Sequence, residues 1–360
     1  MIGHMRDGGA LVRSAVSPMA QLFLIHKKGV AMRWGCVFVL GLSLFFTCIH
    51  LHAVGQDKDK KKIEAKKKAN VYTDPADAPI DCKIQGEYAS DDHKLAAQVV
   101  ARGNGKFDVY ILQGGLPGAG WDPKSKKVKI EANFDKDKDV VEFSGSGYNK
   151  GSRIDVARQN LVLATDDPVH ISLARVERKS PTLGATPPKD AVILFDGRNA
   201  DEWKEGKMSG DLLGVPNTTK RTFTNFKLHI EFRTPFQPTA GGQGRGNSGV
   251  YVCGKEVQVL DSFGLKGANN ECGAIYGERA PNVNMCFPPL VWQTFDMEHR
   301  AGKIDPDTKK QAPPRITVRH NGILVHEGFE LKGGANQGNI HLQNHGNPVV
   351  YRNVWVVELR

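Results

Sequence analysis

"ITVRHNGILVHE", residues 316–327, decides the fold, because it reads as two alternating strands joined by a two-residue turn. Asn321 and Gly322 both tolerate the positive φ of a type I′ turn, and Asn-Gly between alternating runs is the strongest short-range signal of a β-hairpin. Apolar and polar residues alternate on both sides of the turn, so each strand would bury one face. The stretch therefore predicts an antiparallel sheet that packs on a core.

Similar alternating runs recur from residue 190 to the C-terminus, separated by Gly, Asp, Asn and Pro. No segment of this region has the apolar spacing of an amphipathic helix of ordinary length. Many short strands with turns between them are typical of an antiparallel β-sandwich or jelly roll, which we predict here. Besides the hairpin, the predicted strands lie at residues 191–195, 226–234, 248–252, 256–261, 291–300, 338–343 and 350–359.

A small β-rich domain is predicted before the sandwich, over residues 79–178. Runs such as "KFDVYIL" and "VVEFSG" are rich in β-branched and aromatic residues and are bounded by turn residues. A charged linker over residues 56–78 precedes this domain, and a Pro-rich linker over residues 179–189 follows it. The sandwich is then expected over residues 190–360, which makes the whole chain all-β.

A glycine motif at residues 244–249, "GRGNSG", matches the G-x-G-x-x-G fingerprint of dinucleotide sites. That fingerprint requires a helix directly after it, because the helix N-terminus binds the pyrophosphate. Here "VYVCGKEVQVLD" follows, which predicts strand. We therefore interpret the match as accidental and expect the glycines to allow a tight loop.

The net charge of +10 invites a nucleic-acid interpretation, but the charge is unevenly placed. Residues 1–68 contain 12 basic and 4 acidic residues, which leaves a net charge of only +2 for residues 69–360. No basic stripe with interleaved aromatic residues marks a nucleic-acid surface. The sequence therefore predicts no nucleic-acid partner.

The leader, residues 1–55, has the features of an export signal, with a start at Met32. An apolar run over residues 35–49 follows a single arginine, and small residues stand at the positions before Gly55 that a signal peptidase reads. The segment is either cleaved after Gly55 or retained as an anchor, so we predict a periplasmic or cell-envelope location. Four cysteines could then oxidise, and their spacing indicates no zinc site: Cys82, Cys253, Cys272 and Cys286.

Polar residues that bind sugars and transfer protons alternate along several predicted strands. His229, Glu231 and Arg233 share one strand face. On other strands, Glu256 shares a face with Gln258 ahead of Asp261, and His341 alternates with Gln343 and His345. Arg352 is expected on the face opposite Tyr351, Asn353 and Trp355. If the four strands are neighbours, these side chains form one concave polar platform; the alternative is an ordinary solvent face.

Seven segments, in order and spacing, resemble the 3-keto-disaccharide hydrolase domain family, long catalogued as a domain of unknown function. They are "ILFDGRNADEW", "FTNFKLHIEFRTP", "GNSGVYV", "EVQVLDSFG", "CGAIYGERAPNVN", "ITVRHNGILVHE" and "IHLQNHGNPVVYRNVWVVEL". The similarity covers residues 190–360, and bacterial members, including those of planctomycetes, often carry an exported leader. It implies a concanavalin-like jelly roll with its site on the concave sheet. The implied substrate is a 3-keto-glycoside, made by a separate sugar 3-dehydrogenase.

The resemblance implies proton abstraction beside the ketone, loss of the glycosidic oxygen and, for a hydrolase, addition of water. Such a path needs a base, donors for the enolate oxygen and an acid. Our hypothesis makes His345 or Glu256 the base, and Glu231 or Asp261 an acid or a partner of an arginine. Enolate or hydroxyl contacts are assigned to Arg352, Arg233 and Gln343, and other substrate contacts to Gln258, Tyr276, His341 and Asn247.

Three other interpretations stay open at this stage. A carbohydrate-binding module has the same fold, but it would favour Trp and Tyr platforms over ionisable groups. A conventional glycosidase of this fold would show closely spaced acidic residues on one strand, and none are found. A divalent cation could bind His341 and His345 with Glu256 or Asp261, but strand geometry separates the two histidines by roughly 13 Å. The sequence therefore assigns no cofactor.

Overall fold

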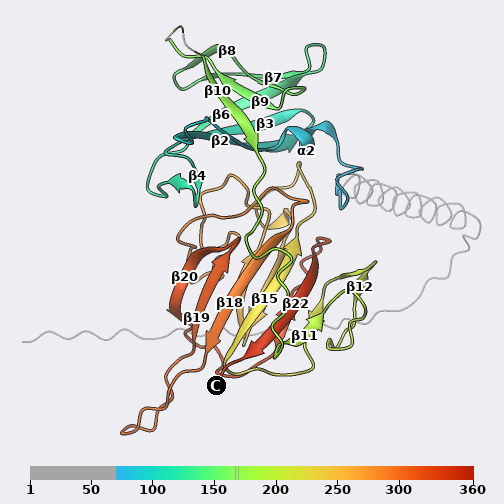
Figure 1. Ribbon diagram of the computed structural model, residues 1–360, viewed down its shortest axis with the longest axis vertical. Helices are drawn as coiled ribbons and strands as arrows, with labels where there is room; N and C mark the ends of the chain where they lie inside the picture. The colour runs from blue at the N-terminus through green and yellow to red at the C-terminus, as the bar shows by residue number, and fades with distance from the viewer. Residues whose placement is uncertain (1–69, 167, 169) are drawn as a thin grey trace, which may run out of the picture. The chain divides into compact units, whose positions relative to one another are not determined.

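The computed structural model of the protein describes residues 70–166, 168 and 170–360, and nearly all of its regular structure is β (Figure 1). One five-residue helix, α2 (Ile80–Ile84), and one turn of 3₁₀ helix, η1 (Gly242–Gly244), are the helical elements of this described part. Neither is long and apolar enough to cross a membrane. The predicted leader and most of the linker over 56–78 lie outside the described residues.

The first β region is a closed antiparallel barrel, in the order β1-β10-β9-β8-β7-β6-β3-β2. Most neighbours in the barrel are consecutive in the chain, so short turns join them. Two short strands, β4 (Leu116–Pro117) and β5 (Gly120–Trp121), pair with each other between β3 and β6. The barrel strands are β1 (Gly86–Ala89), β2 (Leu95–Gly103), β3 (Lys106–Gln113), β6 (Val128–Asp135), β7 (Val140–Gly145), β8 (Tyr148–Asp155), β9 (Asn160–Leu163) and β10 (Ile171–Val176).

Alternate side chains of the strands fill the barrel interior. In β6, for example, Ile130 is buried while Glu131 is exposed. Strand β2 differs because it is apolar on both faces: Val99 joins the barrel core, whereas Val100 belongs to the hydrophobic cluster that includes the C-terminal sheets. One side of the barrel is therefore a packing surface rather than a solvent surface.

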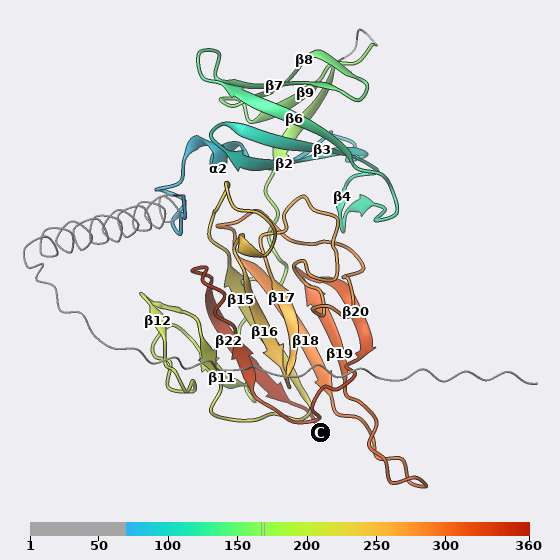
Figure 2. The same ribbon diagram turned by 180° about the vertical axis from the view of Figure 1, so that it is seen from behind.

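The C-terminal region contains two antiparallel sheets, which we call the large sheet and the small sheet. The large sheet has the order β12-β13-β22-β15-β18-β19-β20, with β11 also paired to β22; the small sheet has the order β14-β21-β16-β17. Figure 1 labels most strands of the large sheet, and Figure 2 shows β16 and β17 of the small sheet from behind. The fold is all-β, with antiparallel sheets after a small β-rich domain, as predicted; that this first domain closes into a barrel was not predicted.

The strands of the large sheet are β11 (Val192–Phe195), β12 (Met208–Ser209), β13 (Leu212–Leu213), β15 (Phe226–Arg233), β18 (Gln293–Arg300), β19 (Arg315–His320), β20 (Ile323–Glu330) and β22 (Val350–Glu358). The strands of the small sheet are β14 (Asn217–Thr218), β16 (Ser248–Val252), β17 (Lys255–Val259) and β21 (Ile340–Leu342).

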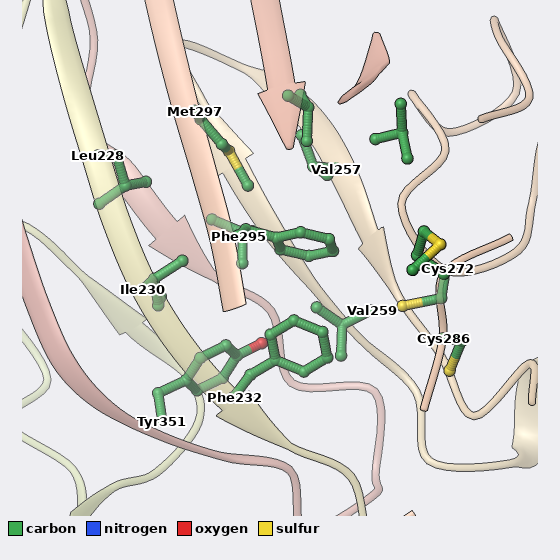
Figure 3. Packing of buried hydrophobic residues seen from close by; sticks show 14 of the residues in the cluster. Leu228, Ile230, Phe232, Val257, Val259, Cys272, Cys286, Phe295, Met297 and Tyr351 are labelled. Carbon is green, nitrogen blue, oxygen red and sulfur yellow. The ribbon is translucent and has the colours of Figure 1, made fainter. Parts of the chain in front are cut away.

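The core lies between the inner faces of the two sheets (Figure 3). Ile230 and Phe232 of β15 and Phe295 of β18 contribute to it from the large sheet, and Val257 and Val259 of β17 contribute from the small sheet. All five side chains are fully buried. Each such burial contributes roughly 1.5–3 kcal/mol, so this core holds the two sheets together. The polar residues of each sheet are consequently turned to the two outer faces.

The hairpin that the sequence predicts is confirmed. β19 and β20 pair antiparallel from His320↔Ile323 onward, and the two turn residues Asn321 and Gly322 have φ values of 49° and 81°. The prediction for the "GRGNSG" motif is also confirmed, since strand β16 begins at Ser248 within it.

Two predictions about the polar strands are wrong. The four strands do not form one platform, because β15 and β22 belong to the large sheet and β17 and β21 to the small sheet. In β22, Arg352, Asn353 and Trp355 lie on the same outer face rather than on opposite faces. A register shift against β15 occurs here, and Asn353 has a φ of 46°, so the extra residue resets the alternation.

The cysteines of the described region are free thiols. Cys253, Cys272 and Cys286 are buried, and Cys82 is half-buried. Burial raises the pKa of the Cys286 thiol, beside Cys272 in the core. A raised pKa reduces the thiolate fraction, so these side chains act as apolar core residues in this fold.

Candidate active site

The outer face of the small sheet brings together most of the predicted site residues. Strand alternation turns Glu256 and Gln258 of β17 outward while Val257 and Val259 enter the core. On the neighbouring strands the outward residues include Tyr251 of β16 and His341 of β21, with Gln343 just beyond. We call this surface the small-sheet site.

The Glu256 side chain lies diagonally over Gly249 of the neighbouring strand, which pairs directly with Gln258 and leaves room for the carboxyl group. A Cβ at Gly249 would meet the Glu256 carboxyl group, with the carboxyl carbon at 2.8 Å. Tyr251 donates its hydroxyl hydrogen to Glu256 Oε2 at 2.8 Å. Burial raises the pKa of Glu256, although the Tyr251 hydrogen bond and the nearby His345 act in the opposite direction. Glu256 is therefore a carboxylate with increased basicity, which suits a general base.

Tyr251 was not predicted as a site residue, although its position two residues after Gly249 places it on the same face. Burial and the Glu256 carboxylate raise the pKa of its phenol, so it stays a hydrogen-bond donor. Gln343 donates from Nε2 to the Tyr251 oxygen at 3.3 Å. The three side chains thus form one chain of hydrogen bonds that ends on the carboxylate.

Three amide side chains surround this carboxylate and keep acceptors unused. Gln243, which the sequence did not indicate, accepts hydrogen bonds at Oε1 from Gln258 Nε2 at 2.9 Å and from Asn247 Nδ2 at 3.0 Å. The side-chain oxygens of Asn247, Gln258 and Gln343 are buried and have no partner among the described residues. A buried acceptor without a donor costs about 1–3 kcal/mol, so these oxygens mark a site that a ligand with hydroxyl groups would complete.

His345 and Tyr276 lie at the exposed rim of the site. His345 follows β21 and is exposed, and its charge lowers the pKa of Glu256. Tyr276 is 44% exposed, and its backbone N–H donates to the Glu256 carbonyl oxygen at 3.0 Å. Each residue is therefore accessible from solvent near Glu256, and the roles assigned to them stay predictions.

His341 lies on the same face but is tied into the protein. Its Nδ1 is 2.9 Å from Thr218 Oγ1, and Thr218 donates to Glu205 Oε1 at 3.0 Å. Burial lowers the pKa of His341, so the ring is neutral. No group of three or more His, Cys, Asp or Glu side chains in the described part of the chain is arranged to hold a metal ion. The predicted alternative of a cation between the two histidines therefore has no geometric support here.

Asp261, predicted to contact substrate, lies inside the protein instead. It is 3% exposed, and its Oδ2 accepts a hydrogen bond from Arg245 Nε at 2.6 Å. Arg245 also donates to the carbonyl oxygens of Ala101 and Pro238, both at 3.2 Å. The prediction that Asp261 orients an arginine fits this arrangement, but substrate contact does not.

Glu231 and Arg352 form an ion pair on the outer face of the large sheet, across the core from the small-sheet site. Glu231 is fully buried and accepts from Arg352 Nε at 2.7 Å and from Asn353 Nδ2 at 2.9 Å. Burial alone would raise the pKa of Glu231, but hydrogen bonds from His229, Asn353, Gly184 and Arg352 lower it to about 2. The structure therefore does not bring Glu231 together with Glu256, and a catalytic role for Glu231 stays a prediction.

The segment that covers Glu231 is the predicted Pro-rich linker, and we call its residues 180–185 the strap. Thr182 Oγ1 donates to Asp296 Oδ2 at 2.7 Å, and the Gly184 N–H donates to Glu231 Oε1. Asn353 Nδ2 donates to the Ala185 carbonyl oxygen at 3.0 Å. Figure 1 shows this segment crossing β15 and β18. Asp296, Glu231 and Asn353 of this face are thus hydrogen-bonded to the strap.

His229 and Arg233 complete the same face. His229 Nδ1 lies 2.6 Å from Asp296 Oδ1, and its ring stacks on Trp355 at 4.9 Å. Burial opposes a charge on His229, but the two carboxylates beside it raise its pKa. Arg233 lies over the Trp292 ring, 5.0 Å from its centroid. Neither arginine predicted to stabilise the enolate lies on the small-sheet face.

The protein is an all-β sandwich that carries a partly buried carboxylate and a cluster of amide side chains on one outer face. Carboxylates and amides are the groups that transfer protons and form hydrogen bonds with sugar hydroxyl groups. Residues 190–357 match the family described as "3-keto-alpha-glucoside-1,2-lyase-like domain". The C-terminal half of the chain therefore contains a domain similar to this family. A search of curated proteins finds no match to the chain.

Solved structures of three proteins from Parabacteroides distasonis ATCC 8503 are similar to this half of the chain, each described as a "putative glycosyl hydrolase". The first, at 2.13 Å resolution, is 30% identical with a TM-score of 0.44, and the match covers 48% of this chain and 86% of that chain. The second, at 1.70 Å, is 18% identical with a TM-score of 0.37, covering 48% and 95%. The third, at 2.00 Å, is 22% identical with a TM-score of 0.35, covering 47% and 99%.

Proposed function

We propose that the small-sheet site cleaves the glycosidic bond of 3-keto-glycosides. The observation that carries the proposal is Glu256, a carboxylate whose pKa is raised by burial and whose only direct side-chain donor described here is Tyr251. The ketone acidifies the proton on the neighbouring ring carbon, so a carboxylate of increased basicity is suited to remove it. The family match over residues 190–357 supports this reaction class.

In the proposed reaction Glu256 takes the proton from C2, and the C–H electron pair forms an enolate with the ketone oxygen at C3. The enolate then expels the glycosidic oxygen from C1, and His345 donates a proton to that leaving oxygen. The unsaturated keto-sugar is the product of a lyase, and addition of water at C1 completes a net hydrolysis. Both outcomes share the first step, so both depend on Glu256.

The remaining residues of the face bind and orient the sugar. Ring hydroxyl groups donate to the unpartnered oxygens of Asn247, Gln258 and Gln343. Tyr276, exposed beside Glu256, contributes a phenolic donor for the enolate oxygen, a role that the sequence assigned to arginines of the other sheet. The proposal includes export of the chain and a separate sugar 3-dehydrogenase that supplies the ketone, as the leader and the resemblance predict.

A non-catalytic carbohydrate-binding site is the second candidate, because the amide cluster would bind hydroxyl groups whether or not a bond is cleaved. The test incubates the purified chain with 3-keto-glucosides and their unoxidised parents, with and without a chelator, and follows products by mass spectrometry. Cleavage of the keto compounds alone supports the proposal. Binding without cleavage supports the second candidate, and cleavage of the parents overturns both.

Glu256→Gln provides the internal test of mechanism. We expect kcat/KM to fall by at least about a hundredfold, the usual contribution of a general base. Glu298→Gln is the matched control, because Glu298 is a half-exposed carboxylate on the large sheet that pairs with Arg300. Full turnover by Glu256→Gln would remove Glu256 from the mechanism.

A further inference from the structure

Lys127, directly before β6, is a largely buried cation of the barrel. Its ammonium donates to Gln98 Oε1 at 3.2 Å and to the carbonyl oxygens of Gly264 and Leu265 at 3.2 and 3.0 Å. It also lies 4.7 Å from the centroid of the Trp121 ring. Burial lowers the pKa of Lys127 to about 8. Burial opposes its charge, the carboxylates of Glu271 and Glu87 favour it, and its direct hydrogen-bond partners are neutral oxygens of other segments.

Gly264 and Leu265 belong to residues 261–277, which we call the site loop. The barrel-facing end of this loop fits closely: Gly264 has a φ of +79°, and a Cβ there would lie 3.3 Å from the Tyr110 ring. Asn284 Nδ2 donates to the same Leu265 carbonyl oxygen at 3.1 Å. Lys127 thus binds two consecutive carbonyl groups of a segment that has no regular structure of its own.

The other end of the site loop holds residues of the small-sheet site. The Asn270 carbonyl oxygen accepts from Gln243 Nε2 at 2.8 Å and from Gln258 Nε2 at 3.4 Å. The Tyr276 N–H donates to the Glu256 carbonyl oxygen at 3.0 Å. The amide cluster and the exposed tyrosine therefore depend on where this loop lies.

We propose that Lys127 is a positioning residue for the small-sheet site: it fixes the barrel-facing end of the site loop, and the loop fixes Gln258 and Tyr276. The barrel then has a defined task, which is to support a loop of the sandwich. The kinetic part of this inference rests on the proposed function. The structural part stands on the hydrogen bonds of Lys127 alone.

The test is Lys127→Met in the full chain, with Lys129→Met as the matched control. Lys129 lies two residues further on, is exposed and pairs with Asp108 at 3.0 Å. We expect amide hydrogen exchange in residues 262–277 to become at least about tenfold faster in Lys127→Met only, because local opening becomes easier. KM for a 3-keto-glucoside should rise about tenfold because Gln258 is displaced, and kcat should fall as well because the loop also places Tyr276, the proposed donor to the enolate oxygen.

Unchanged exchange in residues 262–277, or faster exchange with an unchanged KM, would overturn the proposal. If Lys127→Met does not fold, Lys127→Gln is tested instead, because its amide keeps a donor. It should give a smaller increase of exchange in residues 262–277 and of KM. No increase in either quantity would also overturn the proposal. An inert wild-type protein would refute the proposed function, whereas the exchange data would still decide whether Lys127 holds the loop.

Discussion

The two outer faces of the sandwich carry the same kinds of residue and put them to different uses. On the large sheet, Glu231 receives hydrogen bonds from three side chains and one backbone amide, and its pKa is about 2. On the small sheet, Glu256 receives one from Tyr251, and burial raises its pKa. A carboxylate such as Glu231, whose oxygens are hydrogen-bonded within the protein, stabilises the fold. A carboxylate such as Glu256, which has one side-chain donor, is free to bind a ligand.

The strap accounts for much of this difference. It supplies the Gly184 N–H to Glu231 and the Thr182 hydroxyl to Asp296, so both carboxylates receive donors from the strap, whereas the buried Trp355 Nε1 on the same face has no partner among the described residues. In the described region, the side-chain oxygens of Asn247, Gln258 and Gln343 receive no hydrogen bond from such a segment. Polarity alone therefore does not identify a site; the missing partners do.

The largest predicted effect is a loss of unfolding free energy on substitution of Glu231, and it tests whether the two faces differ as described. Glu231→Gln should lower the free energy of unfolding at pH 7 by about 3 kcal/mol, because it leaves Arg352 and His229 without their carboxylate. The turnover of the folded fraction should stay unchanged. Urea unfolding followed by tryptophan fluorescence measures the first quantity, with Glu298→Gln as control. Loss of turnover at unchanged stability would mean that the large-sheet face is catalytic after all.

Because of Glu231, we expect the unfolding free energy to fall at acid pH. Its pKa is lowered from 4.5 to about 2 on folding, so its contribution is present above pH 4.5 and is lost as pH falls toward 2. That shift corresponds to about 3 kcal/mol in the wild type. The Glu231→Gln protein should lack this fall, and an identical fall at acid pH in both proteins would contradict the assignment.

Gly249→Ala sharpens the comparison from the side of the small sheet. The added Cβ would meet the Glu256 carboxyl group, so the base must move. We expect kcat to fall by about tenfold to a hundredfold, the cost of a displacement of about 1 Å. Gly241→Ala is the control, since a Cβ there meets nothing within 4 Å and the residue is extended, with a φ of −146°. Equal kcat values for the two variants would show that the space left by Gly249 does not position the Glu256 carboxyl group for catalysis.

The smallest predicted effect is a change in the unfolding free energy of Glu256→Gln, and its sign is the informative part. Because the pKa of Glu256 is raised on folding, its ionisation opposes folding above its unfolded pKa, and stability falls as pH rises through that range. Glu256→Gln should therefore raise the unfolding free energy at pH 7, on the order of 1 kcal/mol, by removing a desolvated charge. The gain should vanish below about pH 4, where wild-type Glu256 is protonated. A loss of stability at pH 7 would show that this carboxylate is structural, like Glu231.

Local signals in the sequence were sufficient for much of the fold. The Asn321-Gly322 turn and the alternation in β15, β17 and β20 depend on neighbours in the chain, so they could be predicted. Two strands of the barrel gave no such signal. β2 is apolar on both faces because its outer face packs against the sandwich cluster, and β8, "YNKGSRID", is mostly polar.

The site was harder to predict because strand order is a long-range property. Alternation places Glu231 and Glu256 on outward faces, but only the pairing of strands shows that those faces are on opposite sides of a core. The bulge at Asn353 depends on the register against β15, which the sequence of β22 alone does not contain. Gly249 could have been noticed, since a glycine diagonal to a carboxylate on the neighbouring strand is a place where a side chain is missing.

The strap also affects how this half of the chain could be shuffled between proteins during evolution. The family match begins at residue 190, whereas the hydrogen bonds that complete the large sheet begin at Ser180, which lies 2.6 Å from Thr294. A gene fusion joined at residue 190 would lose the Gly184 N–H that binds Glu231 and the Thr182 hydroxyl that binds Asp296. A successful transplant must carry some ten residues of upstream sequence, or replace His229 and Glu231 at the same time.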